Sequence, residues 1–297
     1  PWADRVSAIL EMYLGGQGVG EACDRLLFGE ANPSGRLSET FPYRLEDNPS
    51  YLHFPGNGKR VLYGEDIFVG YRYYDTKKVP VRYAFGHGLS YTEFAYGDLN
   101  LSSAQMTDED ILTVSLKVKN SGKTEGKEVV QLYVADLCGI SERPVKELKG
   151  FAKVHLLPGE EKTVSMEISA RDLSYYEERL GDWYAPSGTY RILIGHASDD
   201  IRLHADVVFE TKKKLPLRVD FTTTFGELLD HTKTAPVITE LLAPLAAAAA
   251  SAEGMSDEYK KLGEQVIREM PLKSLLGQMP GEQVEQLIGQ LNCLLAQ

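Results

Sequence analysis

The stretch that decides the organisation of this chain runs from Val61 to Phe94 and reads VLYGEDIFVGYRYYDTKKVPVRYAFGHGLSYTEF. It holds nine aromatic residues, several β-branched residues and a Gly-His-Gly turn at residues 86–88. Aromatic and β-branched side chains favour strands and buried surfaces, although residues 61–75 fit either a helix or a strand. Helical and strand patterns mix before this stretch, and strand patterns alone follow it as far as about residue 210. We therefore predict a domain boundary near residue 95.

The composition is that of an ordinary globular protein, with 297 residues of which 43% are hydrophobic and 25% charged. This length suits two domains or slightly more. The formal net charge is −11, so the chain lacks the basic surface that attracts nucleic acid or an anionic membrane. No apolar run reaches the length of a membrane span. We expect neither nucleic acid nor a membrane as a partner.

The cysteines are Cys23, Cys138 and Cys293, at wide spacings. No pair has the CxxC spacing of a zinc site or a redox motif. Cys23 and Cys293 lie in apolar helical patterns, so we expect both thiols to be buried. Free thiols favour a reducing compartment, and the expected location is the cytoplasm. The chain begins Pro-Trp-Ala-Asp without an initiator Met, which suggests a cut inside a longer protein.

Residues 1–95 have the pattern of an α/β fold. Val6 to Leu14 has apolar residues at helical spacing, and Gly20 to Phe28 predicts a second short helix. Leu37 to Phe41 predicts a strand, and residues 43–60 a surface loop. An α/β layer needs several parallel strands covered on both faces, and this region offers too few. We expect the rest of this domain's sheet to lie upstream.

Residues 96–210 have an all-β pattern, in which apolar and polar residues alternate between frequent turns. The predicted strands are Leu112–Lys119, Glu128–Val134, Val145–Val154, Thr163–Ile168, Tyr190–Gly195 and Ile201–Phe209. Short strands with Gly- and Pro-containing turns between them are typical of a β-sandwich.

Residues 211–297 predict a helical tail. Ser256 is expected to cap a helix whose apolar stripe runs from Tyr259 to Met270 and which Pro271 ends. A second stripe predicts another helix: Val284, Leu287, Ile288, Leu291, Leu294 and Leu295. These faces must be buried against each other, against the missing part of the protein or against a second subunit. The last alternative predicts a homodimer formed through the tail.

Glu65 is the one candidate for the rim of a binding pocket. Tyr63, Phe68 and Tyr71 stand near it in the sequence, and sugar sites place aromatic rings beside carboxylates. Ordinary packing of these rings in a core is the alternative interpretation, and it is the more common one.

A histidine, a carboxylate pair and a glycine-rich segment elsewhere in the chain have structural interpretations. His87 lies between two glycines, and we expect a structural role in the turn. Glu177 and Glu178 are neighbours on the chain and would point to opposite faces of a strand, so their adjacency is no evidence of a catalytic pair. They lie between predicted strands of the sandwich, and we expect them to be solvated. The glycines of residues 15–20 lack the strand and spacing of a nucleotide loop. No pattern for a catalytic nucleophile, a metal site or a cofactor is present, so none is predicted.

Four motifs resemble the C-terminal portion of family 3 glycoside hydrolases in sequence, order and spacing. The first is GEANPSGRL at 29–37 with TFP at 40–42, the second YGEDIFVGYRYYD at 63–75, the third FGHGLSYT at 85–92, and the fourth RPVKELKGF at 143–151 with LPGE at 157–160. The resemblance covers about residues 1–210. The tail is similar to extensions on some bacterial members.

The resemblance implies a layout for the full-length protein. A (β/α)8 barrel bears an aspartate nucleophile, an αβα sandwich domain supplies a glutamate acid/base, and a fibronectin-III-like domain follows. Residues 1–95 then form the end of the αβα domain, 96–210 the fibronectin-III-like domain, and 211–297 the tail. Neither catalytic segment has a counterpart here, so no catalytic residue is assigned to this chain, and Glu65 does not match the acid/base position.

The implied function is that of the C-terminal portion of a retaining β-glycosidase, by default a β-glucosidase, that hydrolyses terminal β-linked sugars by double displacement. Its expected partners are a β-glucoside or oligosaccharide substrate and the missing catalytic barrel. This chain alone is expected to be inactive and structural. The alternatives are a non-catalytic module for glycan binding or dimerisation, and the same family acting as a xylosidase, an arabinosidase or an N-acetylglucosaminidase.

Overall fold

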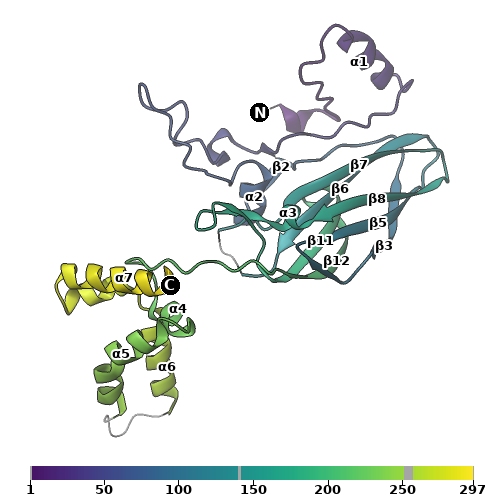
Figure 1. Cartoon of the computed structure of the whole chain (residues 1–297). Helices are drawn as coiled ribbons and strands as arrows, with labels where there is room; N and C mark the ends of the chain where they lie inside the picture. The colour runs from purple at the N-terminus through teal and green to yellow at the C-terminus, as the bar shows by residue number, and fades with distance from the viewer. Residues whose placement is uncertain (1, 140–141, 251–256, 297) are drawn as a thin grey trace. The chain divides into compact units, whose positions relative to one another are not determined.

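The computed structural model describes residues 2–139, 142–250 and 257–296 and contains two compact units (Figure 1). The first unit comprises residues 1–177 and 183–213, and the second comprises 178–182 and 214–297. Among the described residues, no helix has both the length and the apolar character needed to cross a bilayer.

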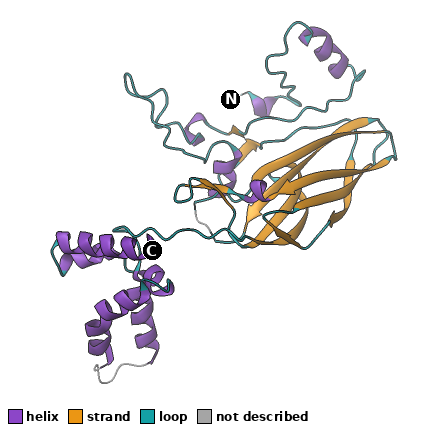
Figure 2. Cartoon of the chain, viewed as in Figure 1, coloured by secondary structure: helices purple, strands orange, loops and turns teal. Residues whose placement is uncertain are grey.

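The first unit is built around a β-sandwich (Figure 2). Its strands are β3 (Phe94–Leu101), β4 (Gln105–Thr107), β5 (Ile111–Asn120), β6 (Gly126–Asp136), β7 (Glu147–Leu156), β8 (Glu161–Ser169), β11 (Gly188–Ala197) and β12 (Asp200–Glu210). One sheet has the order β4-β12-β11-β6-β7 and the other the order β3-β5-β8. Neighbouring strands are antiparallel except β12 and β4, which are parallel.

The core of the sandwich follows from the alternation in the sequence. In β5, Leu112, Val114, Leu116 and Val118 are each at most 2% exposed, while the residues between them face away from the core. The β-sandwich and every strand predicted for it are confirmed. The prediction missed β3, whose alternation is interrupted by a register shift after Gly97. It also missed β4, the short helix α3 (Ala170–Leu173) and a hairpin of β9 (Tyr175–Glu177) and β10 (Asp182–Tyr184).

The segment before the sandwich has little regular structure. Its elements are η1 (Ala3–Arg5), α1 (Val19–Leu27), β1 (Phe41–Pro42), η2 (Leu45–Asp47), α2 (Tyr71–Lys77) and β2 (Val81–Tyr83). The predicted helix over Val6 to Leu14 is wrong, because a helix this short needs a surface to pack on and its apolar side chains are exposed. The predicted strand over Leu37 to Phe41 is reduced to β1, which pairs with β2 in a two-stranded sheet. The second predicted helix is confirmed as α1.

Residues 61–75 fit either a helix or a strand in sequence, and the structure forms a helix only from Tyr71 onward. α2 starts at Tyr71, directly after Gly70, whose φ of 55° is open to glycine at little cost. The Tyr71 ring stacks on Phe85 with centroids 4.8 Å apart and meets Tyr133 edge-on at 5.8 Å. α2 is thereby fixed to the sandwich.

The second unit is helical, as predicted. It contains α4 (Phe225–Asp230), α5 (Ala235–Ala250), α6 (Asp257–Glu269), η3 (Leu272–Gly277) and α7 (Gly281–Ala296). Its core is formed by Val219, Phe225, Leu228, Ile238, Leu272, Leu275, Val284 and Leu291. The predicted cap Ser256 lies outside the described residues. Cys293 is exposed rather than buried, because it lies beside the apolar stripe of α7 and not within it.

Candidate functional site

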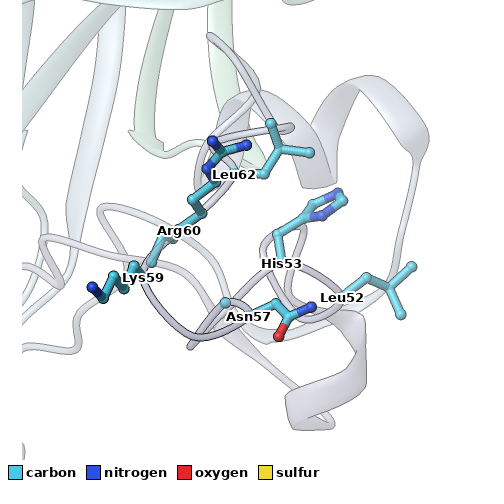
Figure 3. Close-up of a pocket in the computed structure, with 8 residues that line it drawn as sticks. Leu52, His53, Asn57, Lys59, Arg60 and Leu62 are labelled. Atoms are coloured by element: carbon cyan, nitrogen blue, oxygen red, sulfur yellow. The ribbon is translucent and has the colours of Figure 1, made fainter.

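The loop between η2 and α2 forms a hollow. Its volume is about 620 Å³, and its walls are Leu52, His53, Gly56, Asn57, Lys59, Arg60, Val61 and Leu62. Figure 3 shows the His53 ring and the Arg60 side chain on facing sides of the hollow, with Lys59 extending outward. Leu52 is 88% exposed, so the hollow is a surface depression rather than an enclosed pocket.

This hollow lacks the groups that glycoside hydrolysis requires. Retaining glycosidases place two carboxyl groups about 5–5.5 Å apart on either side of the sugar. None of the wall residues is an acid, and His53 supplies the one aromatic ring among them. The hollow therefore cannot act as a retaining glycosidase site by itself.

Glu65 does not line this hollow. Its side chain is half-buried, and its Oε2 atom is buried without a hydrogen-bond partner among the described residues. The aromatic residues near it in sequence do not gather around it: Tyr71 packs on the sandwich and Tyr63 is 79% exposed. Its place at a pocket rim stays a prediction.

His87 lies inside the turn that leads into the sandwich. Its ring stacks on Tyr83, with centroids 5.4 Å apart. Its backbone N–H donates to the carbonyl of Ala84, and its own carbonyl accepts from the N–H of Leu37. Burial lowers the pKa of the His87 imidazole below its ordinary value. These contacts suit the structural role expected of it.

The expectation for the Glu177–Glu178 pair is wrong for one member. Glu177 lies in β9 and is 8% exposed, and its Oε2 accepts a hydrogen bond from the hydroxyl of Tyr175 at 3.1 Å. Glu178 is exposed. Glu177 is the last residue of β9, whereas Glu178 begins the turn that follows this strand.

A group of ionisable side chains lies around Glu128, which is fully buried. Arg36 Nη2 donates to Glu128 Oε2 at 2.8 Å, and the Tyr96 hydroxyl donates to Oε1 at 2.8 Å. His196 Nδ1 lies 2.8 Å from the same Oε1. We call Arg36, Tyr96, Glu128 and His196 the Glu128 cluster. Its groups meet one another away from solvent, so they hold the structure together rather than bind a substrate.

His196 links this cluster to the third motif. Its Nδ1 faces the Glu128 carboxylate, and its Nε2 lies 3.0 Å from the carbonyl oxygen of Gly88. Both partners are acceptors, and a histidine ring nitrogen donates to an acceptor when it carries a proton. Burial alone would raise the pKa of Glu128, but the hydrogen bond from His196 and the charge of Arg36 hold it below its ordinary value.

Sequence reasoning did not identify the Glu128 cluster, although one signal was present. Glu128 lies on the same face of β6 as Val130, Leu132 and Val134, and these three side chains are in the core. A carboxylate on the inward face of a strand must be paired, since an unpaired buried charge is very costly. Its partners are too distant in sequence to be identified without the fold, and they are Arg36, Tyr96 and His196.

A second buried charge network lies at the fourth motif. Arg143 Nη1 donates to Asp136 at 2.8 Å and Nη2 to Glu147 at 3.0 Å. Arg72 and Lys149 also pair with Glu147, at 2.9 and 3.5 Å. Burial alone would raise the pKa of Glu147, but the charge of Lys149 and the hydrogen bond from Arg143 hold it below its ordinary value. These charges are satisfied internally.

The four motifs meet in pairs at the junction with the sandwich. Asn32 Oδ1 of the first motif accepts from the N–H of Tyr91, in the third, at 2.8 Å. Asp75 of the second motif pairs with Lys146 of the fourth at 2.7 Å. The motifs that suggested a family are therefore parts of a structural junction. Among the described residues, no group of three or more His, Cys, Asp or Glu side chains is placed to hold a metal ion.

Comparisons with known proteins agree with this architecture. The glycosyl hydrolase family 3 C-terminal domain matches residues 1–91, and the fibronectin type III-like domain matches residues 128–198. The thermostable β-glucosidase B of Acetivibrio thermocellus is 45% identical over 98% of this chain and 39% of its own length. A β-glucosidase of Kluyveromyces marxianus is 47% identical over 68% of this chain and 24% of its own length.

Solved structures give the same result. The family 3 β-glucosidase of Bifidobacterium adolescentis has a TM-score of 0.71 and 38% identity, over 80% of this chain and 35% of that one. The K. marxianus β-glucosidase in complex with glucose has a TM-score of 0.66 and 42% identity, over 71% of this chain and 25% of that one. In both kinds of comparison, this chain is similar to family 3 glycoside hydrolases. It corresponds to their C-terminal part and spans less than two fifths of the length of these relatives.

Proposed function

We propose that the parent protein is a retaining β-glucosidase and that this chain is its C-terminal, non-catalytic part. The match to β-glucosidases over 24–39% of their length is the observation that supports this proposal. The names of these relatives favour β-glucosidase over the xylosidase, arabinosidase and N-acetylglucosaminidase alternatives. The substrate is then a β-glucoside or oligosaccharide, and the catalytic barrel belongs to the part that the chain does not span.

The role of this chain within such an enzyme is structural. The Glu128 cluster, through Arg36, and the pair of Arg72 with Glu147 join the segment before the sandwich to the sandwich through paired charges. Arrangements of this kind fix one geometry, because removing one partner leaves the other charge buried and unpaired. We infer that the sandwich holds the end of the αβα domain in place, while the catalytic carboxylates are supplied from elsewhere.

The purified 297-residue chain is expected to show no hydrolysis of an aryl β-glucoside above a mock preparation. Double displacement needs both a nucleophile and an acid/base carboxyl group, and we assign neither to this chain. The measurement is release of the aryl alcohol, with an intact family 3 β-glucosidase as positive control. Turnover that co-purifies with the chain would contradict the proposal.

We also propose that the helical tail joins two copies of the protein. On α6, Leu262 and Val266 are 56% and 53% exposed, whereas Ile267 and Met270 pack against the core of the second unit. Light scattering is expected to give twice the chain mass for the full chain and a single mass for a chain that ends at residue 213. A single mass for both chains, or a dimer of the shortened chain, would contradict this proposal.

A further inference from the structure

We propose that the hollow at residues 52–62 receives a segment of the catalytic part of the parent enzyme that carries apolar and acidic side chains. This inference rests on the proposed function, because it requires a catalytic part outside this chain. It names the surface on which that part docks.

The first reason is the exposure of the walls. Leu52, Val61 and Leu62 are 88%, 46% and 65% exposed, although all three line one concave surface. Burying apolar surface gains about 25 cal/mol per Å², so a hollow lined in this way favours an apolar occupant. The loop that forms it makes little regular structure beyond η2 (Figure 1).

The second reason is the charge of the walls. Lys59, Arg60 and His53 line the hollow, and no acid does. A neutral sugar would be held by aromatic faces and carboxylates, and the hollow offers one imidazole ring and no carboxylate. Cationic groups beside apolar ones instead match a protein segment that presents a carboxylate next to an apolar side chain, since Arg binds carboxylates with paired N–H donors.

The third reason is where exposed apolar surface is concentrated. More than half of the exposed large apolar side chains among the described residues belong to the first 69 residues, and no apolar side chain of those 69 residues is in the buried core. The relatives have 61% or more of their length outside the region matched by this chain. A large part of the protein is thus available to cover this surface, and the hollow is the concave portion of it.

The test is a chimera in which the part of the A. thermocellus β-glucosidase B that precedes its matched region is joined to this chain. Limited trypsin digestion is followed by mass spectrometry at Lys59 and Arg60, both exposed in the free chain. Cleavage at the exposed Lys212 is the internal control. Docking is expected to slow cleavage at Lys59 and Arg60 by about tenfold or more relative to the free chain, because proteolysis follows the population of the open state.

Substitutions in the chimera locate the contact. Leu62→Asp is expected to restore cleavage at Lys59 and Arg60, whereas Val208→Asp, at a 41% exposed position on β12, is expected to leave it protected. Equal cleavage in the free chain and in a chimera that hydrolyses an aryl β-glucoside would overturn this inference and leave the proposed function intact. Protection that persists in Leu62→Asp would also overturn it. A folded but inactive chimera would contradict the proposed function, while its cleavage pattern would still report on the hollow.

Discussion

Glu128→Gln is expected to lower the free energy of unfolding of the first unit by about 3–5 kcal/mol, the usual cost of breaking a buried ion pair from one side. The change keeps the size of the side chain but removes the charge that Arg36 and His196 face at 2.8 Å. The Gln side chain has one acceptor oxygen in place of two carboxylate oxygens, so it cannot accept at both the Arg36 side and the Tyr96 and His196 side. Urea unfolding followed by tryptophan fluorescence measures this loss, because Trp2 and Trp183 both belong to the first unit.

The same substitution should change the dependence of stability on pH. The folded-state pKa of Glu128 lies below the ordinary value of 4.5, so the ionised group stabilises the fold above that value. This stabilisation is lost as the pH falls below 4.5 toward the folded-state pKa. Glu128→Gln should remove this part of the acid dependence. Glu167→Gln, at an exposed position of β8, is the matched control and should stay within about 0.5 kcal/mol of the wild type. Equal losses for the two variants would show that the Glu128 cluster does not stabilise the fold.

The sandwich could be predicted from sequence because both of its sheets lie within the chain. Strands β5, β8 and β12 alternate between a face that packs in the core and a face that does not, and both sheets are present to bury the apolar face. The period-two alternation of apolar and polar residues therefore predicts these strands correctly. The same holds for the tail, where the stripe of α7 packs within the second unit.

The first 69 residues could not be predicted in the same way. Val6 to Leu14 shows helical spacing, but most of the stability of a short helix in a protein comes from packing of its apolar side. No described residue buries this side, and Ile9 and Leu14 are 39% and 101% exposed. The wrong helix prediction over residues 6–14 and the exposed hollow at residues 52–62 therefore have one cause. We assign both surfaces to contact with the rest of the parent enzyme.

The candidate site shows the limit of local reasoning more clearly. Glu65 was selected from its aromatic neighbours in sequence, yet Tyr71 packs against Phe85 instead. The Glu128 cluster joins residues up to 160 positions apart, as in the contact of Arg36 with His196. Pairing over such separations depends on strand order, which no local pattern contains.

Gly86, in the turn of the third motif, is the second position where a small substitution should strongly lower the free energy of unfolding. Gly86 has a φ of +83°, and a Cβ added there would lie 2.1 Å from Gln131 Oε1. Gln131 is 3% exposed, and its Oε1 accepts from the hydroxyl of the fully buried Tyr133 at 2.6 Å. Its Nε2 donates to the Gly86 carbonyl at 3.2 Å. Gln131 therefore cannot move aside without breaking these bonds.

Gly86→Ala is thus expected to lower the free energy of unfolding by about 2–5 kcal/mol. A left-handed conformation costs about 1–2 kcal/mol for a residue with a Cβ, and forcing a group into a packed region costs about 1–3 kcal/mol more. Gly97→Ala is the matched control, since an added Cβ there meets no atom within 4 Å, and it should change stability by no more than about 0.5 kcal/mol. Denaturant midpoints at constant m-value separate the two variants. If Gly86→Ala unfolded like Gly97→Ala, the turn would have to relax away from Gln131, and the junction between the family 3 segment and the sandwich would be looser than these contacts require.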